Sequence, residues 1–113
     1  MKMITAVINP DKLDGVHDEL KKSGISYITV METKASAVEG GFTERYRGTT
    51  YVTDYYDFTR VDVVVDDDKL DAAINIILDV TTADDKAIGR IFTSTIDDVI
   101  NIATYKNKSE TAA

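Results

Sequence analysis

Hydrophobic and polar positions predict a strand, a helix and a second strand in the first third of the chain. Residues 3–9 are rich in β-branched and apolar side chains, which indicates a strand. Apolar residues then recur at helical spacing between Pro10, which suits the first turn of a helix, and Gly24, which is placed to end it. These helical positions are Leu13, Val16 and Leu20. Residues 25–33 predict the second strand.

The second half of the chain predicts the same order again. Residues 61–65 form a β-branched run broken only by Asp62, which indicates a central strand. Three aspartates at residues 66–68 place negative charge where it stabilises a helix N-terminus. The helix that follows has an apolar stripe at i, i+3, i+4, i+7 and i+8, formed by Leu70, Ala73, Ile74, Ile77 and Leu78. Residues 90–93 predict the last strand of the unit, and residues 99–102 a short additional strand.

A four-residue sequence, Asp-Lys-Leu-Asp, occurs at residues 11–14 and again at residues 68–71. Both copies lie where a predicted strand leads into a predicted helix, which favours internal duplication over chance. A strand-helix-strand unit used twice is typical of the ferredoxin-like α+β fold, in which two helices cover one face of an antiparallel sheet. The strands are apolar on both sides, since residues 63–65 are three valines, and a face without helices then needs a partner chain. We expect one domain over residues 1–113 that forms a homo-oligomer.

Composition narrows the classes of function. The 113 residues are 43% hydrophobic and 29% charged, as in an ordinary globular domain. The net charge of −7, without a basic stripe, predicts no nucleic-acid binding. No apolar run approaches the length of a signal-peptide core or a membrane span, so we expect a cytoplasmic protein without membrane insertion.

The sequence offers no set of residues for catalysis. It has no cysteine, which excludes disulfides, thiol chemistry and thiolate metal sites. A Ser-His-Asp set, a histidine-containing metal cluster and a glycine-rich P-loop are also missing from the sequence. His17 is the sole histidine and is predicted to be a surface residue. We therefore predict neither enzymatic activity nor a metal site.

A long connection, residues 37–58, separates the two halves and is rich in aromatic residues. A connection of this length in a small domain is uncommon unless it is functional or disordered. Exposed aromatic side chains with arginines among them suit a protein-recognition surface. The alternative is an extended hairpin whose aromatic rings only pack on each other. We expect contact with a partner protein through Phe42, Arg45, Tyr46, Arg47, Tyr51 and Tyr55.

Three stretches resemble the nitrogen-regulatory PII signal-transduction family. Residues 43–51, Thr-Glu-Arg-Tyr-Arg-Gly-Thr-Thr-Tyr, look like its T-loop signature. Residues 1–14 resemble its first strand and helix, and residues 89–92, Gly-Arg-Ile-Phe, the end of its phosphate-gripping B-loop. The resemblance implies a homotrimer of ferredoxin-like subunits with nucleotide sites in the clefts between them. It also implies that the T-loop, about residues 37–58, docks on target proteins, of which a membrane transporter is one candidate.

The resemblance further implies an adenine-nucleotide site and its residues. Near the adenine it places Thr29, Asp62 and Val64, and in the B-loop (about residues 82–90) Lys86, Ala87, Ile88, Gly89 and Arg90, with Val38 from the T-loop. Asp62 suits this role because a carboxylate accepts hydrogen bonds from an exocyclic amine or a ribose hydroxyl. Tyr51 matches a tyrosine that some members carry for nucleotidylylation, although a loop tyrosine is more often a contact residue. The tail, about residues 105–113, is expected to be frayed.

Departures from the family pattern alter the expected ligand. The B-loop stretch keeps one glycine and gains Asp84 and Asp85, which would repel a polyphosphate unless they point away or hold a metal ion. Asn101 and Ala103 stand where typical members have arginines that grip the outer phosphates. Two lost charge-assisted contacts of ~1.5–3 kcal/mol each weaken ATP binding most. We therefore expect ADP or AMP to be favoured over ATP.

The 2-oxoglutarate site of the family is also altered. Glu39 and Phe58 stand where the family has a glutamine that helps to hold Mg²⁺ and a lysine. A dianion beside a carboxylate, without a lysine to neutralise it, is disfavoured. We expect no response to 2-oxoglutarate, and a role in sensing energy state.

Three other functions stay open on the sequence alone. The altered B-loop is compatible with a PII-like receptor for another ligand, such as cyclic di-AMP. A small ferredoxin-like enzyme resembling acylphosphatases would need an arginine in an early phosphate loop, and residues 9–24 contain none. Amino-acid-binding regulatory modules share the doubled unit but do not carry so long an aromatic loop.

Overall fold

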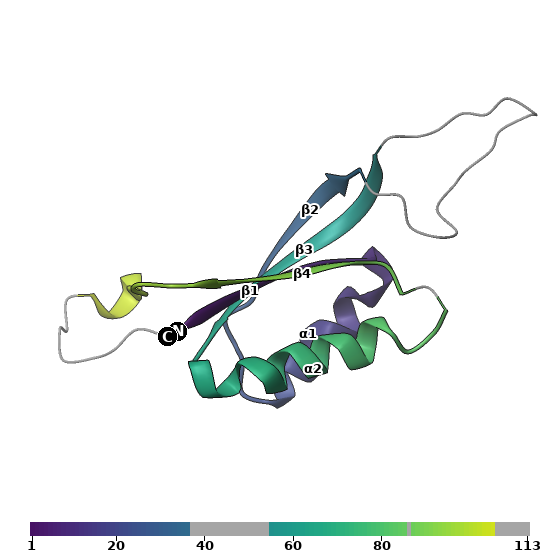
Figure 1. Cartoon of the computed structure of the whole chain (residues 1–113). Helices are drawn as coiled ribbons and strands as arrows, with labels where there is room; N and C mark the ends of the chain where they lie inside the picture. The colour runs from purple at the N-terminus through teal and green to yellow at the C-terminus, as the bar shows by residue number, and fades with distance from the viewer. Residues whose placement is uncertain (37–54, 86, 106–113) are drawn as a thin grey trace, which may run out of the picture.

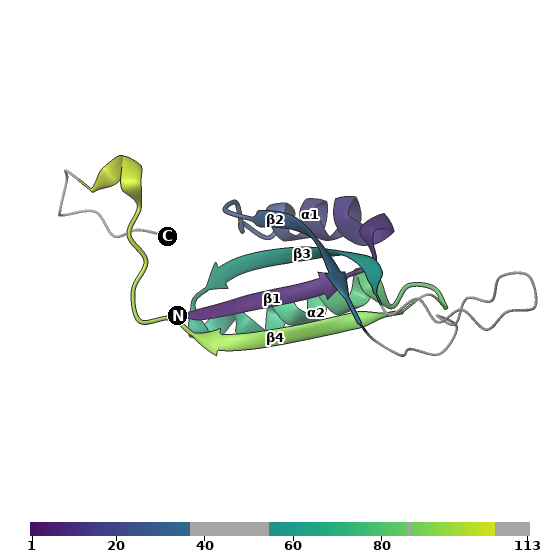
Figure 2. The same ribbon diagram turned by 90° about the horizontal axis from the view of Figure 1, so that it is seen from above.

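The computed structural model describes residues 1–36, 55–85 and 87–105, and its core is one antiparallel sheet. The four strands are β1 (Lys2–Ile8), β2 (Thr29–Ala35), β3 (Tyr56–Val65) and β4 (Gly89–Thr95), and they lie in the order β2-β3-β1-β4. Both long helices, α1 (Leu13–Lys22) and α2 (Leu70–Thr81), cover the same face of the sheet, as Figures 1 and 2 show. The predicted ferredoxin-like double β-α-β fold is confirmed.

The two Asp-Lys-Leu-Asp copies fold in the same way. In the first half β1 leads into a 3₁₀ turn, η1 (Pro10–Lys12), and then into α1; in the second half β3 leads into η2 (Asp67–Lys69) and then into α2. Lys12 and Lys69 each end the turn, and the next leucine starts the helix. Gly24 follows α1 with a positive φ of 92°, which a glycine adopts without strain. The repeated sequence thus corresponds to a repeated local structure.

The core lies between the sheet and the two helices. Strands β1 and β3 send alternate side chains to this layer, as a two-residue period requires, and Ile91 of β4 packs against it. The helices contribute the residues of their predicted apolar stripes, apart from Leu78, which is exposed because it lies on the outer side of α2. The buried apolar residues of this layer are Ile4, Ala6, Ile8, Val16, Leu20, Val61, Val63, Val65, Ala73 and Ile77.

Several element boundaries differ from the predicted ones. The second strand begins at Thr29, because Ile25 and Ile28 pack against the core from a loop. Strand β3 begins at Tyr56, so the end of the predicted 37–58 connection is part of the sheet. The prediction of a short strand at residues 99–102 is wrong. Among residues 1–36, 55–85 and 87–105, no strand pairs with that segment, and a 3₁₀ turn, η3 (Ile102–Thr104), forms at its end.

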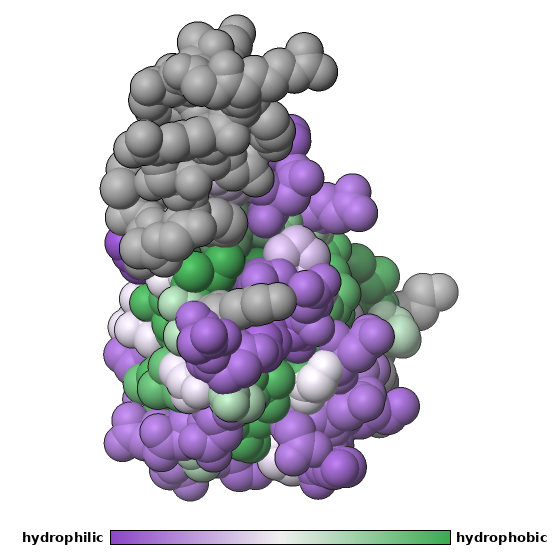
Figure 3. Space-filling view, turned by 90° about the vertical axis from the view of Figure 1, so that its right-hand side faces the viewer, coloured by the Kyte–Doolittle hydropathy of each residue, from purple (hydrophilic) through white to green (hydrophobic). Residues whose placement is uncertain are grey.

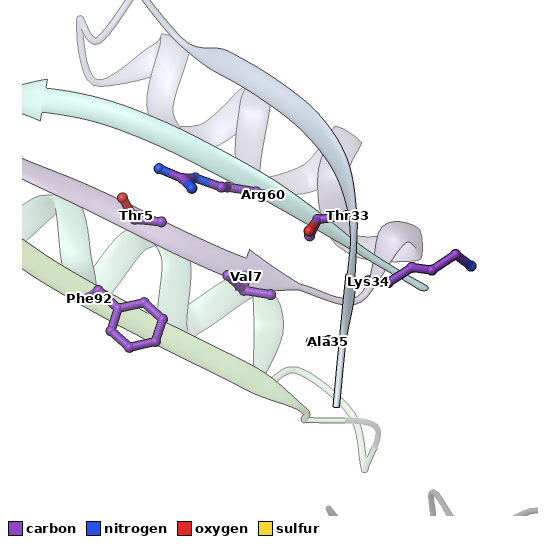
Figure 4. Close-up of a pocket in the computed structure, with 7 residues that line it drawn as sticks. All are labelled: Thr5, Val7, Thr33, Lys34, Ala35, Arg60 and Phe92. Atoms are coloured by element: carbon purple, nitrogen blue, oxygen red, sulfur yellow. The ribbon is translucent and has the colours of Figure 1, made fainter. Parts of the chain in front are cut away.

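The other face of the sheet is not covered by the helices and carries apolar side chains. Directly paired residues share a face, so Phe92 on β4, Thr5 on β1 and Asp62 on β3 form one row across it. Val64 also lies on this face, while Val63 and Val65 enter the core. Phe92 is 57% exposed and borders a shallow hollow of about 360 Å³ (Figure 4). An exposed apolar face of this kind is the surface that a partner chain covers.

Neither α1 nor α2, nor any other helix in the described part of the chain, is long and apolar enough to span a bilayer.

Candidate functional site

Three residues expected near an adenine lie close together on the uncovered face. Thr29 on β2 is the register partner of Asp62 on β3, and Val64 follows two residues along the same strand and face. The carboxylate of Asp62 accepts hydrogen bonds from Nε of Arg60 at 3.1 and 3.2 Å. A carboxylate has about four lone-pair positions, so this contact still leaves acceptor capacity at Asp62.

A pocket of about 450 Å³ lies beside these residues, between residues 24–27, the end of β3 and residues 99–103. It contains Val64 together with Asn101 and Ala103, the two positions compared above with phosphate-gripping arginines. We call this region, with Thr29 and Asp62, the pocket end of the sheet. The Asn101 side chain accepts a hydrogen bond from the backbone N–H of Ala103 at 2.9 Å and so starts η3.

Other residues of this pocket were not predicted from the sequence. Tyr27 is 81% exposed at its rim, and Lys69 brings a positive charge to it. Tyr27 lies within the segment predicted as a strand, and Lys69 lies in the second copy of the repeat. The two are far apart in the sequence, so no local pattern indicates that they line one pocket.

The expected phosphate-binding residues lie at the opposite end of the sheet, which we call the loop end. Gly89 opens β4 with a φ of 117°, and a Cβ at this position would overlap with the carbonyl oxygen of Val7. Only glycine fits there, so the close approach of the two backbones explains this residue. Arg90 is exposed and its Nη1 donates to the carbonyl oxygen of Gly89 at 2.9 Å. Ala87 is exposed and Ile88 half-buried, while Lys86 lies outside the described residues.

One of the two added carboxylates at the loop end is paired. Nζ of Lys12 lies 2.7 Å from Oδ2 of Asp84, and the Lys12 side chain is only 15% exposed. Asp85 is exposed. Figure 3 looks onto this end of the molecule, where hydrophilic side chains lie around and between hydrophobic ones. The negative charge that the sequence places at residue 84 is therefore partly offset by a lysine from the start of α1.

The pocket end and the loop end are well separated within one chain. Val64 pairs with Met3 on β1, whereas Gly89 pairs with Ile8, five residues further along the same strand. Five strand residues span about 16 Å, and β1 itself lies between β3 and β4. One subunit therefore presents the expected adenine residues and the expected phosphate residues as two separate surfaces.

The expected partner-binding residues fall mainly outside the described part of the chain. Only Tyr55 is described, and it is exposed directly before β3; Val38, Phe42, Arg45, Tyr46, Arg47 and Tyr51 lie outside the described residues. Ala35 and Tyr56 are register partners, so the predicted T-loop leaves from and returns to one place at the edge of the sheet. Phe58 is 3% exposed, so position 58 offers a buried ring and no cation.

The other titratable groups show no catalytic or metal-binding arrangement in residues 1–36, 55–85 and 87–105. No three acidic or histidine side chains of this part are grouped to hold a metal ion. His17 is a surface residue, as predicted, with Nδ1 3.4 Å from Oδ1 of Asp18. A hydrogen bond from the amino group of Met1 lowers the pKa of Asp67, and Glu19 raises the pKa of Lys22 in the same way.

A doubled β-α-β sheet with two separate candidate binding surfaces fits a class of small regulatory binding proteins. The family model described as "Nitrogen regulatory protein P-II" matches residues 1–106. The chain is 39% identical to the Nitrogen regulatory protein P-II of Mesorhizobium japonicum over 92% of its own length and 93% of the relative. It is 38% identical to the Cereibacter sphaeroides protein of that name, over the same shares of both chains.

Another relative, Nitrogen regulatory protein P-II 2 of Methanothermobacter thermautotrophicus, is 36% identical over 92% of this chain and 90% of its own. The chain belongs to the PII family. Proteins of this family are regulatory signal transducers and not enzymes, so the prediction of a non-catalytic role is confirmed. As a family they bind adenine nucleotides and act as homotrimers that contact target proteins.

Proposed function

We propose that this chain forms a homotrimer that binds an adenine nucleotide between its subunits and signals energy state to a target protein through residues 37–58. The observation that carries the proposal is the separation of the pocket end from the loop end. A nucleotide that uses both surfaces has to be held by the pocket end of one subunit and the loop end of the next. The exposed apolar face around Phe92 supplies a surface on which such subunits associate.

The residues at both ends support a preference for ADP or AMP over ATP. At the pocket end, Asn101 and Ala103 bring no positive charge to the place where the family has arginines. At the loop end, Asp85 adds a negative charge, and the carboxylate of Asp84 is partly offset by Lys12. Each additional phosphate therefore gains less than it would in a site with two arginines. Buried Phe58 offers no charge to 2-oxoglutarate, so we propose no response to that ligand.

Calorimetric titration with ADP, AMP, ATP and cyclic di-AMP, with and without Mg²⁺ and 2-oxoglutarate, tests the ligand. Tight binding of ADP or AMP, weaker binding of ATP and no effect of 2-oxoglutarate support the proposal. Tight binding of cyclic di-AMP alone would favour a receptor for that ligand. Tighter binding of ATP than of ADP would contradict the proposed preference.

Mixed trimers test the division of the site between subunits. Val64→Asp removes the pocket end and Arg90→Ala weakens the loop end, so each variant alone is expected to lose binding. In a trimer that contains both variants, one cleft combines an intact pocket end with an intact loop end. Co-expression with two affinity tags should therefore restore one site per mixed trimer, measured by calorimetry after tandem purification. Light scattering on each variant checks that it still assembles. Mixed trimers without any restored binding would contradict a site shared between subunits.

A further inference from the structure

A single ion pair connects the start of α1 to the candidate phosphate loop. Nζ of Lys12 and Oδ2 of Asp84 lie 2.7 Å apart, although 72 positions separate them in the sequence. Lys12 ends η1 directly after β1, and Asp84 lies between α2 and β4. The contact therefore holds together the two segments that flank the start of β4 at the loop end, on the right in Figure 1.

The protein around this ion pair covers the lysine side chain more than the aspartate side chain. The Lys12 side chain is 15% exposed, whereas that of Asp84 is 45% exposed and lies in the loop that precedes Gly89 and Arg90. A carboxylate at this place repels a phosphate, and the repulsion acts strongly over a few ångströms near a protein surface. An ammonium in contact with the carboxylate reduces this repulsion and also limits where the carboxylate can move.

The second copy of the repeat shows that this contact is not a property of the repeated sequence. Lys69 has the same place at the end of η2, but it lines the pocket at the other end of the sheet. The repeat therefore supplies one lysine to each end, and only Lys12 meets a carboxylate of the loop after α2.

We propose that Lys12 is a positioning residue of the nucleotide site, which makes the first part of the loop after α2, residues 82–85, able to accept phosphate by offsetting and fixing Asp84. This inference rests on the proposed nucleotide binding and adds to it the residue that tunes the site for the number of phosphates. Lys12 acts through Asp84. Its effect should grow from adenosine to AMP to ADP and should vanish when residue 84 is neutral.

A double-mutant cycle separates this role from a general structural one. Lys12→Met, Asp84→Asn and the double variant are titrated with adenosine, AMP and ADP by calorimetry. We expect Lys12→Met to weaken ADP binding about tenfold and adenosine binding hardly at all, because the phosphates carry the charge that Asp84 repels more strongly once the ammonium of Lys12 is removed. Asp84→Asn should tighten ADP binding about two- to threefold, and the double variant should bind like Asp84→Asn alone.

Two further variants control for charge and folding. Lys22→Met removes the same charge from the exposed surface of α1, where Lys22 pairs with Glu19, and should leave ADP affinity unchanged. Lys12→Arg keeps the positive charge and should bind ADP nearly as the parent protein does. Thermal unfolding and light scattering show whether each variant is a folded trimer.

The outcomes distinguish this inference from the proposed function. If the parent protein binds no adenine nucleotide, the proposed function fails and the role of Lys12 fails with it. If the parent binds ADP but Lys12→Met weakens binding equally with and without Asp84→Asn, Lys12 does not act through Asp84, and only this inference is overturned. An equal loss for adenosine and ADP would assign Lys12 a purely structural role and would also overturn it.

Discussion

The two ends of the sheet contain similar residues but differ in how closely those residues are packed. Each end has one lysine of the repeat and one glycine with a positive φ: Lys12 and Gly89 at the loop end, Lys69 and Gly24 at the pocket end. At the loop end the glycine touches the backbone of β1 and the lysine pairs with a carboxylate. At the pocket end the glycine has open space and the lysine lines a pocket.

This difference in packing suits the two ends to different parts of a ligand. A closely packed loop end can hold backbone N–H groups in place for a phosphate, because packing fixes their direction. An open pocket end can admit a flat, mostly apolar group such as a purine ring between Tyr27 and Val64. The duplication therefore repeats the local fold, while the residues around each copy determine what it can bind.

Replacing each of the two glycines with alanine should give the largest difference in stability between the two ends. Gly89→Ala puts a Cβ into the Val7 carbonyl and also strains a positive φ, so it should destabilise the protein by about 3 kcal/mol or more. Gly24→Ala has the strain but no overlap, because nothing lies within 4 Å of its Cβ position, and should cost about 1 kcal/mol. Urea unfolding at one fixed subunit concentration measures both values. Equal losses of unfolding free energy for the two variants would show that both ends tolerate an added Cβ equally well. That result would contradict the closer packing at the loop end.

The fold could be predicted largely from sequence, because strands and helices each follow a strong hydrophobic period. The errors lie where apolar residues contact the core without belonging to a strand, as Ile25 and Ile28 do. Residues 99–102 have the composition of a strand, but composition does not reveal whether a strand lies beside them, and none pairs with them in the described part of the chain.

The sequence names residues for the candidate site, but their arrangement could not be predicted from it. Thr29, Asp62 and Val64 are neighbours, as expected, yet they lie far from Gly89 within one subunit. The overlap that requires Gly89 involves the carbonyl of Val7, and the partner of Asp84 is 72 positions away. Contacts of this kind depend on the register of β1 with β4, which no local pattern encodes.

Adding a cation at the pocket end should change ligand preference by an intermediate amount. Ala103→Arg restores a positive charge at an exposed position of the pocket and leaves the turn-starting contact of Asn101 in place. We expect ATP affinity to rise about tenfold, with a smaller rise for ADP, since a charge-assisted contact contributes ~1.5–3 kcal/mol and the outer phosphate gains it.

A matched control adds the same charge elsewhere. Asn75→Arg changes an exposed residue in the middle of α2, which does not line the pocket, and should leave the ratio of ATP to ADP affinity unchanged. Calorimetric titrations of both variants with ATP and ADP give this ratio. The same rise in ATP affinity for both variants would indicate a general charge effect and would contradict a specific phosphate contact at the pocket end.

Replacing each lysine of the repeat should give the smallest difference between the two ends. This difference should appear in the free energy of unfolding. Lys12→Met removes a mostly covered cation from Asp84, but the carboxylate remains 45% exposed and partly solvated, so the cost should be only about 0.5–1 kcal/mol. Lys69→Met changes an exposed residue and should alter stability by less than about 0.5 kcal/mol. Urea unfolding at low and high salt separates the two, because screening should shrink the Lys12 effect and leave the Lys69 effect as it is. A Lys12 effect that does not depend on salt would mean that its hydrocarbon chain, packed at the start of α1, stabilises the loop end more than its charge does.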